Sequence, residues 1–187
     1  KINDVLKNYS KAFNYFNEAN KKSLNLVGEN LLLGNAYMKK VDQYLKQSYI
    51  NFSPKIKTQT TANINFKHFF LIGFPRSGTT LLDTILRSHK DILVVEEKPI
   101  VQRISANLFT SNKLENITKQ EANNLSEIYF AELSKIMDIQ NFNNKILIDK
   151  FPLNIIESRL IHLIFPHAKF IFSVRHPLDC VLSCFMQ

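Results

Sequence analysis

The sequence is poor in cysteine and has no long apolar segment. Its 187 residues include only Cys180 and Cys184, four positions apart in a segment of helical character. Two thiols without nearby partners cannot fill the coordination shell of a zinc ion, so we interpret them as small buried side chains in a reducing compartment. No apolar run approaches the roughly 18 residues of a transmembrane helix, and "KINDVLKNYS" lacks the apolar centre of a signal peptide. These absences predict a cytoplasmic protein without a membrane span.

The composition is that of a folded protein with an anionic partner. Hydrophobic residues make up 45% of the chain and charged residues 21%, which suits one sizeable core, or one domain with an appendage. The formal net charge is +8. Because lysine and arginine are scattered rather than clustered, and no nucleic-acid-binding motif is present, we expect a small anionic ligand rather than nucleic acid.

Residues 1–50 carry a helical pattern. Two sets of apolar residues fall on helical faces, namely Tyr9, Ala12, Phe16 and Ala19, and then Leu32, Ala36 and Tyr44. The small alanines are typical of tetratricopeptide (TPR) repeats, in which they let neighbouring helices approach closely. One partial repeat cannot bury its own apolar face. We therefore expect this segment to pack on the rest of the chain or to belong to a longer helical array, where it would offer a surface to a protein partner.

The rest of the chain predicts a connector followed by an α/β domain. Residues 51–66 are polar and lack periodicity, and from residue 67 to 187 short apolar runs alternate with amphipathic stretches. The candidate strands are 69–72, 92–95, 146–148 and 169–174. The candidate helices are 80–88, 118–137, 154–165 and 178–185, the second of them starting with a capping box of Thr118 and Glu121. This alternation predicts a P-loop-type parallel sheet flanked by helices, with the ligand beyond the carboxyl ends of the strands.

The stretch "GFPRSGTT" has the spacing of a phosphate-binding loop. Gly73 and Gly78 allow a tight turn from strand to helix, so that backbone N–H groups and the positive end of the helix dipole face one anion. Thr79 stands where a nucleotidase carries lysine, and no partner aspartate for magnesium is evident. The loop is therefore poorly suited to a metal-bound triphosphate, and we expect a different anion.

Two segments, "GFPRSGTTLLDTILRSHKDILVVEE" and "ILIDKFPLNIIESRLIHLIFPHAKFIFSVRHPLDCVLSCF", resemble the sulfotransferases that use 3′-phosphoadenosine-5′-phosphosulfate (PAPS). The resemblance covers residues 67–187. It is nearest to the TPR-linked bacterial type and extends to the tyrosylprotein sulfotransferases. It implies transfer of a sulfonate group to an acceptor hydroxyl, without metal, leaving 3′-phosphoadenosine-5′-phosphate (PAP).

The resemblance also implies a set of site residues. The residues matching the family's 5′-phosphosulfate loop are Arg76, Ser77, Gly78, Thr79 and Thr80. Arg175 and Ser183 match the pair that holds the 3′-phosphate. Glu97 matches the catalytic base, although Glu96 beside it could equally take that role. Lys150 matches a lysine that, with Arg76, would stabilise charge on the departing phosphate.

The sequence departs from the family pattern at several positions. Lys90 and Val95 replace a proline and a glycine, and Pro99 replaces the arginine of the tyrosylprotein enzymes. The acceptor therefore stays open between protein tyrosine, a glycan, a lipid and a small molecule. Only four strands are predicted, and the chain stops one helix after the 3′-phosphate motif. We accordingly expect a domain incomplete at its carboxyl end, or a fragment.

Simpler interpretations stand beside these predictions. The loop could be an ordinary turn with a helix cap, Glu97 a solvated acid, and Lys150 a cover for apolar surface through its stem. Arg175 could form a local ion pair with Asp179 at i+4. Two other classes of protein also remain, namely a P-loop kinase or nucleotidase, and a non-catalytic interaction module.

Overall fold

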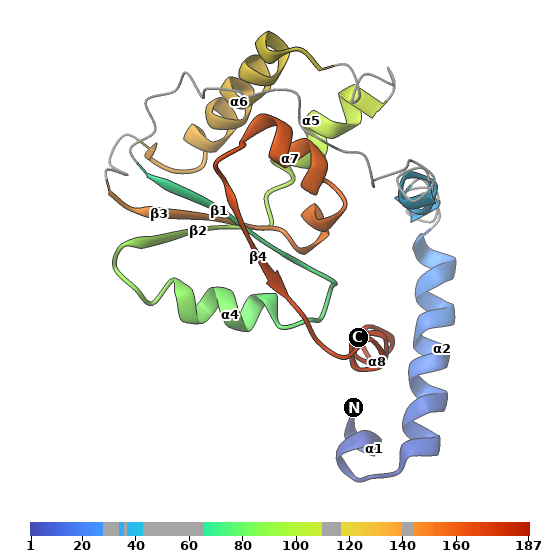
Figure 1. The fold of residues 1–187 in the computed structure, drawn as a ribbon. Coiled ribbons are helices and arrows are strands. Elements are labelled where there is room, and N and C mark those ends of the chain that lie inside the picture. Colours follow the sequence, from blue (N-terminus) through green and yellow to red (C-terminus); the bar gives the residue numbers. More distant parts are fainter. Residues whose placement is uncertain (28–33, 36, 43–65, 110–116, 140–143) are drawn as a thin grey trace. The chain divides into compact units, whose positions relative to one another are not determined.

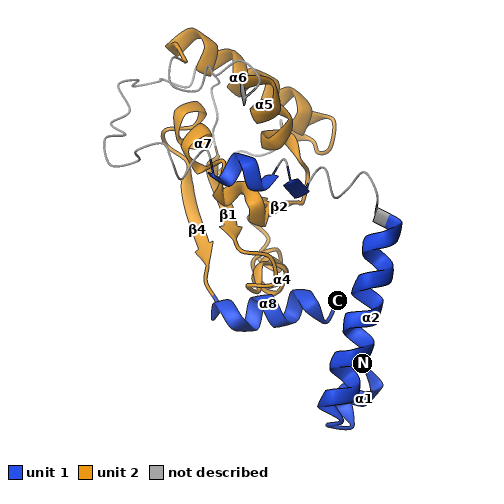
Figure 2. Cartoon of the chain, turned by 90° about the vertical axis from the view of Figure 1, so that its right-hand side faces the viewer, with its two compact units in different colours: residues 1–52, 175–187 blue, residues 53–174 orange. Residues whose placement is uncertain are grey.

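A computed structural model describes residues 1–27, 34–35, 37–42, 66–109, 117–139 and 144–187. The chain divides into two compact units, one of residues 53–174 and one of residues 1–52 with 175–187 (Figure 2). No helix within the described ranges is both long and apolar enough to cross a bilayer.

The larger unit is built on a four-stranded sheet in which every neighbouring pair is parallel (Figure 1). The strand order is β2-β3-β1-β4. The strands are β1 (Lys67–Gly73), β2 (Ile92–Glu96), β3 (Ile146–Lys150) and β4 (Lys169–Ser173). All four predicted strands are confirmed, and so is the α/β class. The order also places β1 and β3 at the centre, which is why their residues are the most deeply buried.

Helices cover both faces of this sheet. One face carries α4 (Thr79–Leu86), and the other carries α5 (Ile100–Phe109), α6 (Lys119–Ser134) and α7 (Ser158–Ile164) (Figure 1). The capping box predicted for α6 is present, since Thr118 Oγ1 accepts from the Glu121 N–H and the Glu121 carboxylate accepts from the Thr118 N–H. Helix α5 was not predicted from the sequence. The prediction of one helix over 154–165 is wrong, because the chain forms a 3-10 helix η4 (Pro152–Ile155) and then α7 there.

The core lies between the sheet and α6. Alternation along β1 directs His68 and Phe70 to this face, where both rings contact Tyr129. The Tyr129 and Phe165 ring centroids are 4.9 Å apart in an edge-to-face arrangement, the geometry that aromatic pairs prefer. A polar group is buried with them: Tyr129 Oη donates to Asp149 Oδ2 at 2.7 Å and lies 3.3 Å from His68 Nε2.

Asp149 and His68 should make the free energy of unfolding depend on pH in opposite directions. Burial raises the pKa of Asp149 from 3.8 to about 7, although the Tyr129 hydrogen bond opposes the rise, and burial lowers the pKa of His68 from 6.5 to about 3. The Asp149 contribution to stability is present below pH 4 and is lost as pH rises through 7. The His68 contribution is present above pH 6.5 and is lost as pH falls toward 3. Between pH 4 and 6.5 the two slopes cancel.

Asp149→Asn should remove the pH dependence of stability that Asp149 causes and leave the one that His68 causes. We expect the free energy of unfolding of the variant, relative to the parent, to rise between about pH 4 and 7 by up to about 1.4 kcal/mol per pH unit. Asparagine keeps an acceptor for Tyr129, so the packing should survive. Urea denaturation at several pH values measures the difference. A difference that does not change with pH would contradict the buried, proton-binding state of Asp149.

The smaller unit is helical. It contains α1 (Ile2–Val5), α2 (Tyr9–Val27) and α8 (Pro177–Phe185), together with described helical residues at 34–35 and 37–42. Phe185 of α8 stacks on Phe13 with ring centroids 5.1 Å apart, and its carbonyl accepts from Asn20 Nδ2 at 2.9 Å. On the predicted face of α2, Ala12 is buried and Tyr9 is exposed.

Several N-terminal predictions are not tested. Leu32, Ala36 and Tyr44 lie outside the described residues. Residues 51–65 of the predicted connector also lie outside them. The TPR-type pairing of helices therefore stays a prediction.

Candidate functional site

The loop between β1 and α4 is a tight turn. Arg76 and Gly78 both have positive φ, at 69° and 96°, and the Ser77 N–H donates to the Phe74 carbonyl at 3.1 Å. Ser173, the last residue of β4, fixes the loop from the side, since its Oγ donates to the Ser77 carbonyl at 2.9 Å. The loop is thus held by two strands, and it leads directly into the first turn of α4.

The loop has features that suit an anion. Ser77 is 7% exposed, and its Oγ has no hydrogen-bond partner among the described residues. A Cβ at Gly73 would lie 2.7 Å from the Ser173 carbonyl oxygen and 2.8 Å from Ser77 Oγ, so only glycine fits there. The unpaired N–H groups of the α4 N-terminus add donors and a positive dipole end. Thr79 is buried, whereas Arg76 and Thr80 are exposed.

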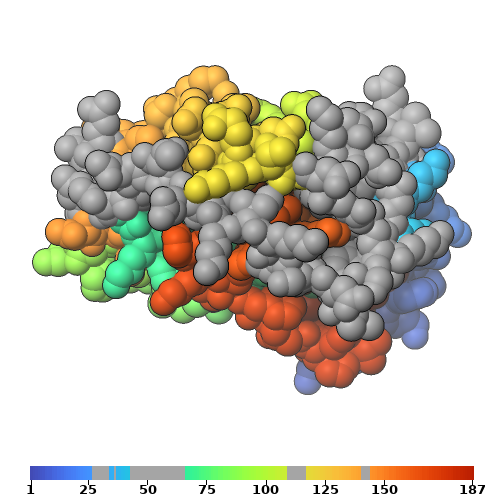
Figure 3. All heavy atoms as spheres, turned by 45° about the horizontal axis from the view of Figure 1, so that its top comes forward, coloured from blue at the N-terminus to red at the C-terminus, as the bar shows by residue number. Residues whose placement is uncertain are grey.

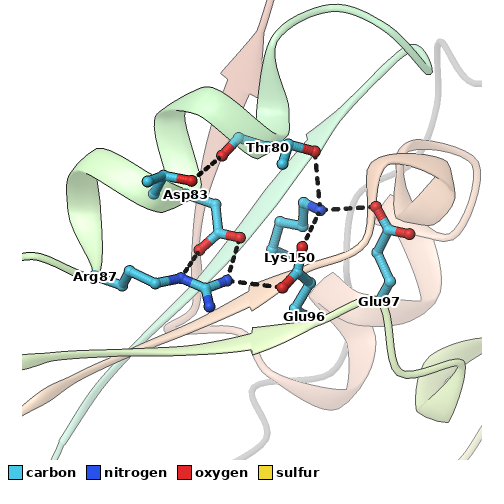
Figure 4. A network of polar contacts seen from close by, with 7 residues as sticks. Thr80, Asp83, Arg87, Glu96, Glu97 and Lys150 are labelled. Atoms are coloured by element: carbon cyan, nitrogen blue, oxygen red, sulfur yellow. Dashed lines mark hydrogen bonds and ion pairs between the residues drawn. The ribbon is translucent and has the colours of Figure 1, made fainter.

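Lys150 lies at the centre of a polar network beside the loop (Figure 4). Its Nζ is 2.7 Å from Glu97 Oε1, 3.2 Å from Glu96 Oε1 and 3.4 Å from Thr80 Oγ1. The lysine side chain is 1% exposed, whereas the two glutamates are 54% and 45% exposed. A buried ammonium is costly unless it is paired, and two carboxylates supply the pairing.

Strand register explains why Lys150 meets Glu96. The two residues are partners in the parallel pairing of β3 with β2, so their side chains leave the sheet on the same face. That face carries α4, which brings Thr80. Asp149 points to the opposite face, where it meets Tyr129. Lys150 therefore belongs to the site, and the preceding residue of the same strand, Asp149, belongs to the core.

Glu97 reaches the same lysine by a different means. Alternation would direct it to the face opposite Glu96, but its backbone is left-handed, with φ of 48°. Its N–H donates to the Lys150 carbonyl at 2.8 Å, which fixes the turn. A left-handed conformation costs a residue with a side chain about 1–2 kcal/mol. In this strained conformation the Glu97 carboxylate contacts Lys150 Nζ.

Asp83 and Arg87 also belong to the network and were not predicted from the sequence. The Arg87 guanidinium donates to Asp83 through Nε at 2.8 Å and Nη2 at 2.5 Å, and Nη2 also donates to Glu96 Oε2 at 3.0 Å. Arg87, and after it Lys150, lowers the pKa of the Glu96 carboxyl. The i,i+4 spacing of Asp83 and Arg87 on a helix was a usable signal for their pairing. No sequence pattern indicated the hydrogen bond from Arg87 to Glu96.

Arg175 and Ser183 belong to the smaller unit. Arg175 Nε lies 3.7 Å from Asp179 Oδ2, so the local ion pair offered as the simpler interpretation is present. Ser183 is on α8. A joint role of these two residues with the loop stays a prediction.

The structure also bears on metal and thiol chemistry. Within the described part of the chain, no group of three or more histidine, cysteine, aspartate or glutamate side chains could hold a metal ion. Cys180 is buried and Cys184 is exposed, and both are free thiols. The prediction of a buried side chain is thus confirmed for Cys180 and wrong for Cys184.

Residues 68–187 match the sequence pattern of a known family, described as "Sulfotransferase family". The chain belongs to this sulfotransferase family. The matched range contains the loop, Glu96, Glu97 and Lys150, and its parallel sheet flanked by helices is sulfotransferase-like.

Individual relatives of this chain are similar to it over part of their length. An uncharacterized protein of Aquifex aeolicus is 28% identical across 100% of this chain, which covers 25% of that protein. Protein-tyrosine sulfotransferase 1 of Danio rerio is 31% identical over 64% of this chain and 36% of its own length. The Homo sapiens protein of the same name is 32% identical over 57% of this chain and 30% of its own length. The chain thus spans about a third or less of these relatives.

Proposed function

We propose that this chain carries the donor loop and the acid–base site of an enzyme that transfers a sulfonate group from PAPS to an acceptor hydroxyl. The observation that carries the proposal is the placement of Lys150 between Thr80, at the start of α4, and the Glu97 carboxylate. An anion site and a general base are thereby linked through one buried cation. The relatives named protein-tyrosine sulfotransferase support tyrosine as one candidate acceptor.

The loop residues would hold the donor. Backbone N–H groups at the start of α4, the unpartnered Ser77 hydroxyl and the Arg76 guanidinium suit the oxygens of a phosphosulfate. We assign the 3′-phosphate to Arg175 and Ser183. When bound, PAPS supplies the activated sulfonate and a phosphate leaving group. No metal ion is required for this assignment, because the cationic side chains and N–H groups carry the positive charge.

The protein's own residues would handle the proton and the developing charge. Glu97 is half exposed, so an acceptor hydroxyl can reach its carboxylate and give up a proton to it. Lys150 lies between Glu97 and Thr80, where its ammonium group would stabilise negative charge that develops near the loop. Arg76 would add to this stabilisation. Holding acceptor and donor in line would supply much of the remaining rate.

Nucleotide binding tests this proposal against the kinase interpretation. PAP should bind at least about tenfold tighter than ADP, because a charge-assisted contact to the 3′-phosphate contributes about 1.5–3 kcal/mol. Arg175→Ala should remove most of this difference while ADP affinity stays the same. Calorimetry without magnesium measures both affinities. Equal affinity for PAP and ADP, or a magnesium-dependent preference for ATP, would contradict the sulfotransferase proposal.

A further inference from the structure

A chain of charges leads from the buried side of α4 to the lysine of the site (Figure 4). It begins at Asp83, whose side chain is 1% exposed, and continues through Arg87, which is 44% exposed, to Glu96. Two nitrogens of the guanidinium bind Asp83 in a fork, which fixes the plane of the guanidinium. Its Nη2 therefore meets Glu96 from an anchored position rather than from a freely moving side chain.

The two glutamates of the site differ in how many of their oxygens are engaged. Glu96 uses both, with Oε1 on Lys150 at 3.2 Å and Oε2 on Arg87 at 3.0 Å. Glu97 uses Oε1 on Lys150 at 2.7 Å. Its Oε2 makes no hydrogen bond or ion pair with any residue that the structure describes, and Figure 4 draws none. One acid is thus held between two cations, and the other keeps an oxygen for an incoming group.

We propose that Asp83 and Arg87 are positioning residues that hold Glu96 as the fixed counter-charge of Lys150 and so reserve Glu97 for the proton of the acceptor. This inference rests on the proposed function. Without Arg87 the two carboxylates would share one ammonium on similar terms, because both contact the same Nζ. A base that alternates between two positions would leave the acceptor without one defined orientation.

The electrostatics agree with this assignment of roles. The groups that face Glu96 are Arg87 at the C-cap of α4, Lys150 from β3 and the neighbouring Glu97. The two cations favour the charged form of Glu96, and its pKa is lowered accordingly, with Arg87 the larger cause. A carboxylate stabilised in this way is a weaker base and a more constant charge. Both properties suit a counter-charge.

Titration of Glu96 tests the holding role without any assay of activity. Arg87→Gln should raise the midpoint of the Glu96 carboxyl in a carbon-13 NMR titration of the whole chain, because the larger of the two causes that lower its pKa is then gone. The matched control is Arg103→Gln, which removes an exposed arginine that pairs with Glu132 at 3.6 Å. It should leave Glu96 unchanged. Since Arg87→Gln leaves Asp83 buried and unpaired, the double variant Asp83→Asn with Arg87→Gln provides the same test in a neutral pair.

Turnover tests the reserving role. In a Glu97→Gln background, Arg87→Gln should restore sulfonate transfer by about tenfold or more, because the released Glu96 can then act as the base. A merely structural arginine would lower turnover further when removed. An unchanged Glu96 midpoint overturns the proposal, and so does a shifted midpoint without recovery of turnover. If the midpoint shifts but the parent transfers no sulfonate from PAPS, the proposed function fails while the holding of Glu96 stands.

Discussion

Glu97→Gln should lower turnover by about 10²–10⁴ while donor affinity stays nearly the same, as expected when a general base is removed. The amide keeps the size of the side chain and can still contact Lys150, but it cannot take a proton. Because Glu97 is half exposed, the fold should tolerate the change. Steady-state transfer of labelled sulfonate measures turnover, and PAP calorimetry measures the donor site separately.

Glu96→Gln is the matched control for this prediction. It removes a carboxylate that contacts the same ammonium, one residue earlier in the chain. We expect a smaller loss of turnover, since Glu96 supplies charge and not proton transfer. Should Glu96→Gln abolish turnover and Glu97→Gln leave it intact, the base would be Glu96 and the assignment would move by one residue.

Lys150→Met is expected to lower turnover by about 10²–10³, the usual effect of removing one group that stabilises developing charge. Methionine keeps the length and the apolar stem of the buried side chain and removes only the ammonium. The change therefore separates the catalytic interpretation from the simpler one, in which the lysine stem merely covers apolar surface. The loss should appear in the catalytic rate more than in PAP affinity.

The control for this change is Lys135→Met. Lys135 caps the carboxyl end of α6 and pairs with Glu132 at the surface. Its replacement should leave turnover unchanged. A Lys150→Met variant as active as the Lys135→Met variant would rule out a role for the Lys150 charge in the reaction.

The strand–loop–helix unit could be predicted from the sequence because its causes are local. Gly73 has no space for a Cβ and Gly78 has a positive φ, and both requirements leave a trace in the spacing of glycines. The capping box of α6 is local in the same sense. The position of Lys150 after a short apolar run also placed it at the carboxyl end of a strand.

Other features depended on contacts between distant parts of the chain. The meeting of Glu96 with Lys150 follows from the register of β2 against β3, which no local pattern encodes. The split of the predicted helix 154–165 accompanies a long-range contact, since buried Asn154 accepts from Gln102 of α5 at 2.5 Å. For α5 itself a signal was present: Ile100, Val101 and Ile104 form a buried face directly after Pro99.

At position 97 the residue that would be most stable differs from the residue that the proposed reaction needs, because the backbone there is left-handed. Glycine would adopt this conformation without steric cost, so selection for stability alone would favour glycine at position 97. It would remove the carboxylate at the same time. A stabilisation campaign that ranks substitutions by melting temperature would therefore tend to choose an inactive protein at this position, and residue 97 should be held constant in any such library.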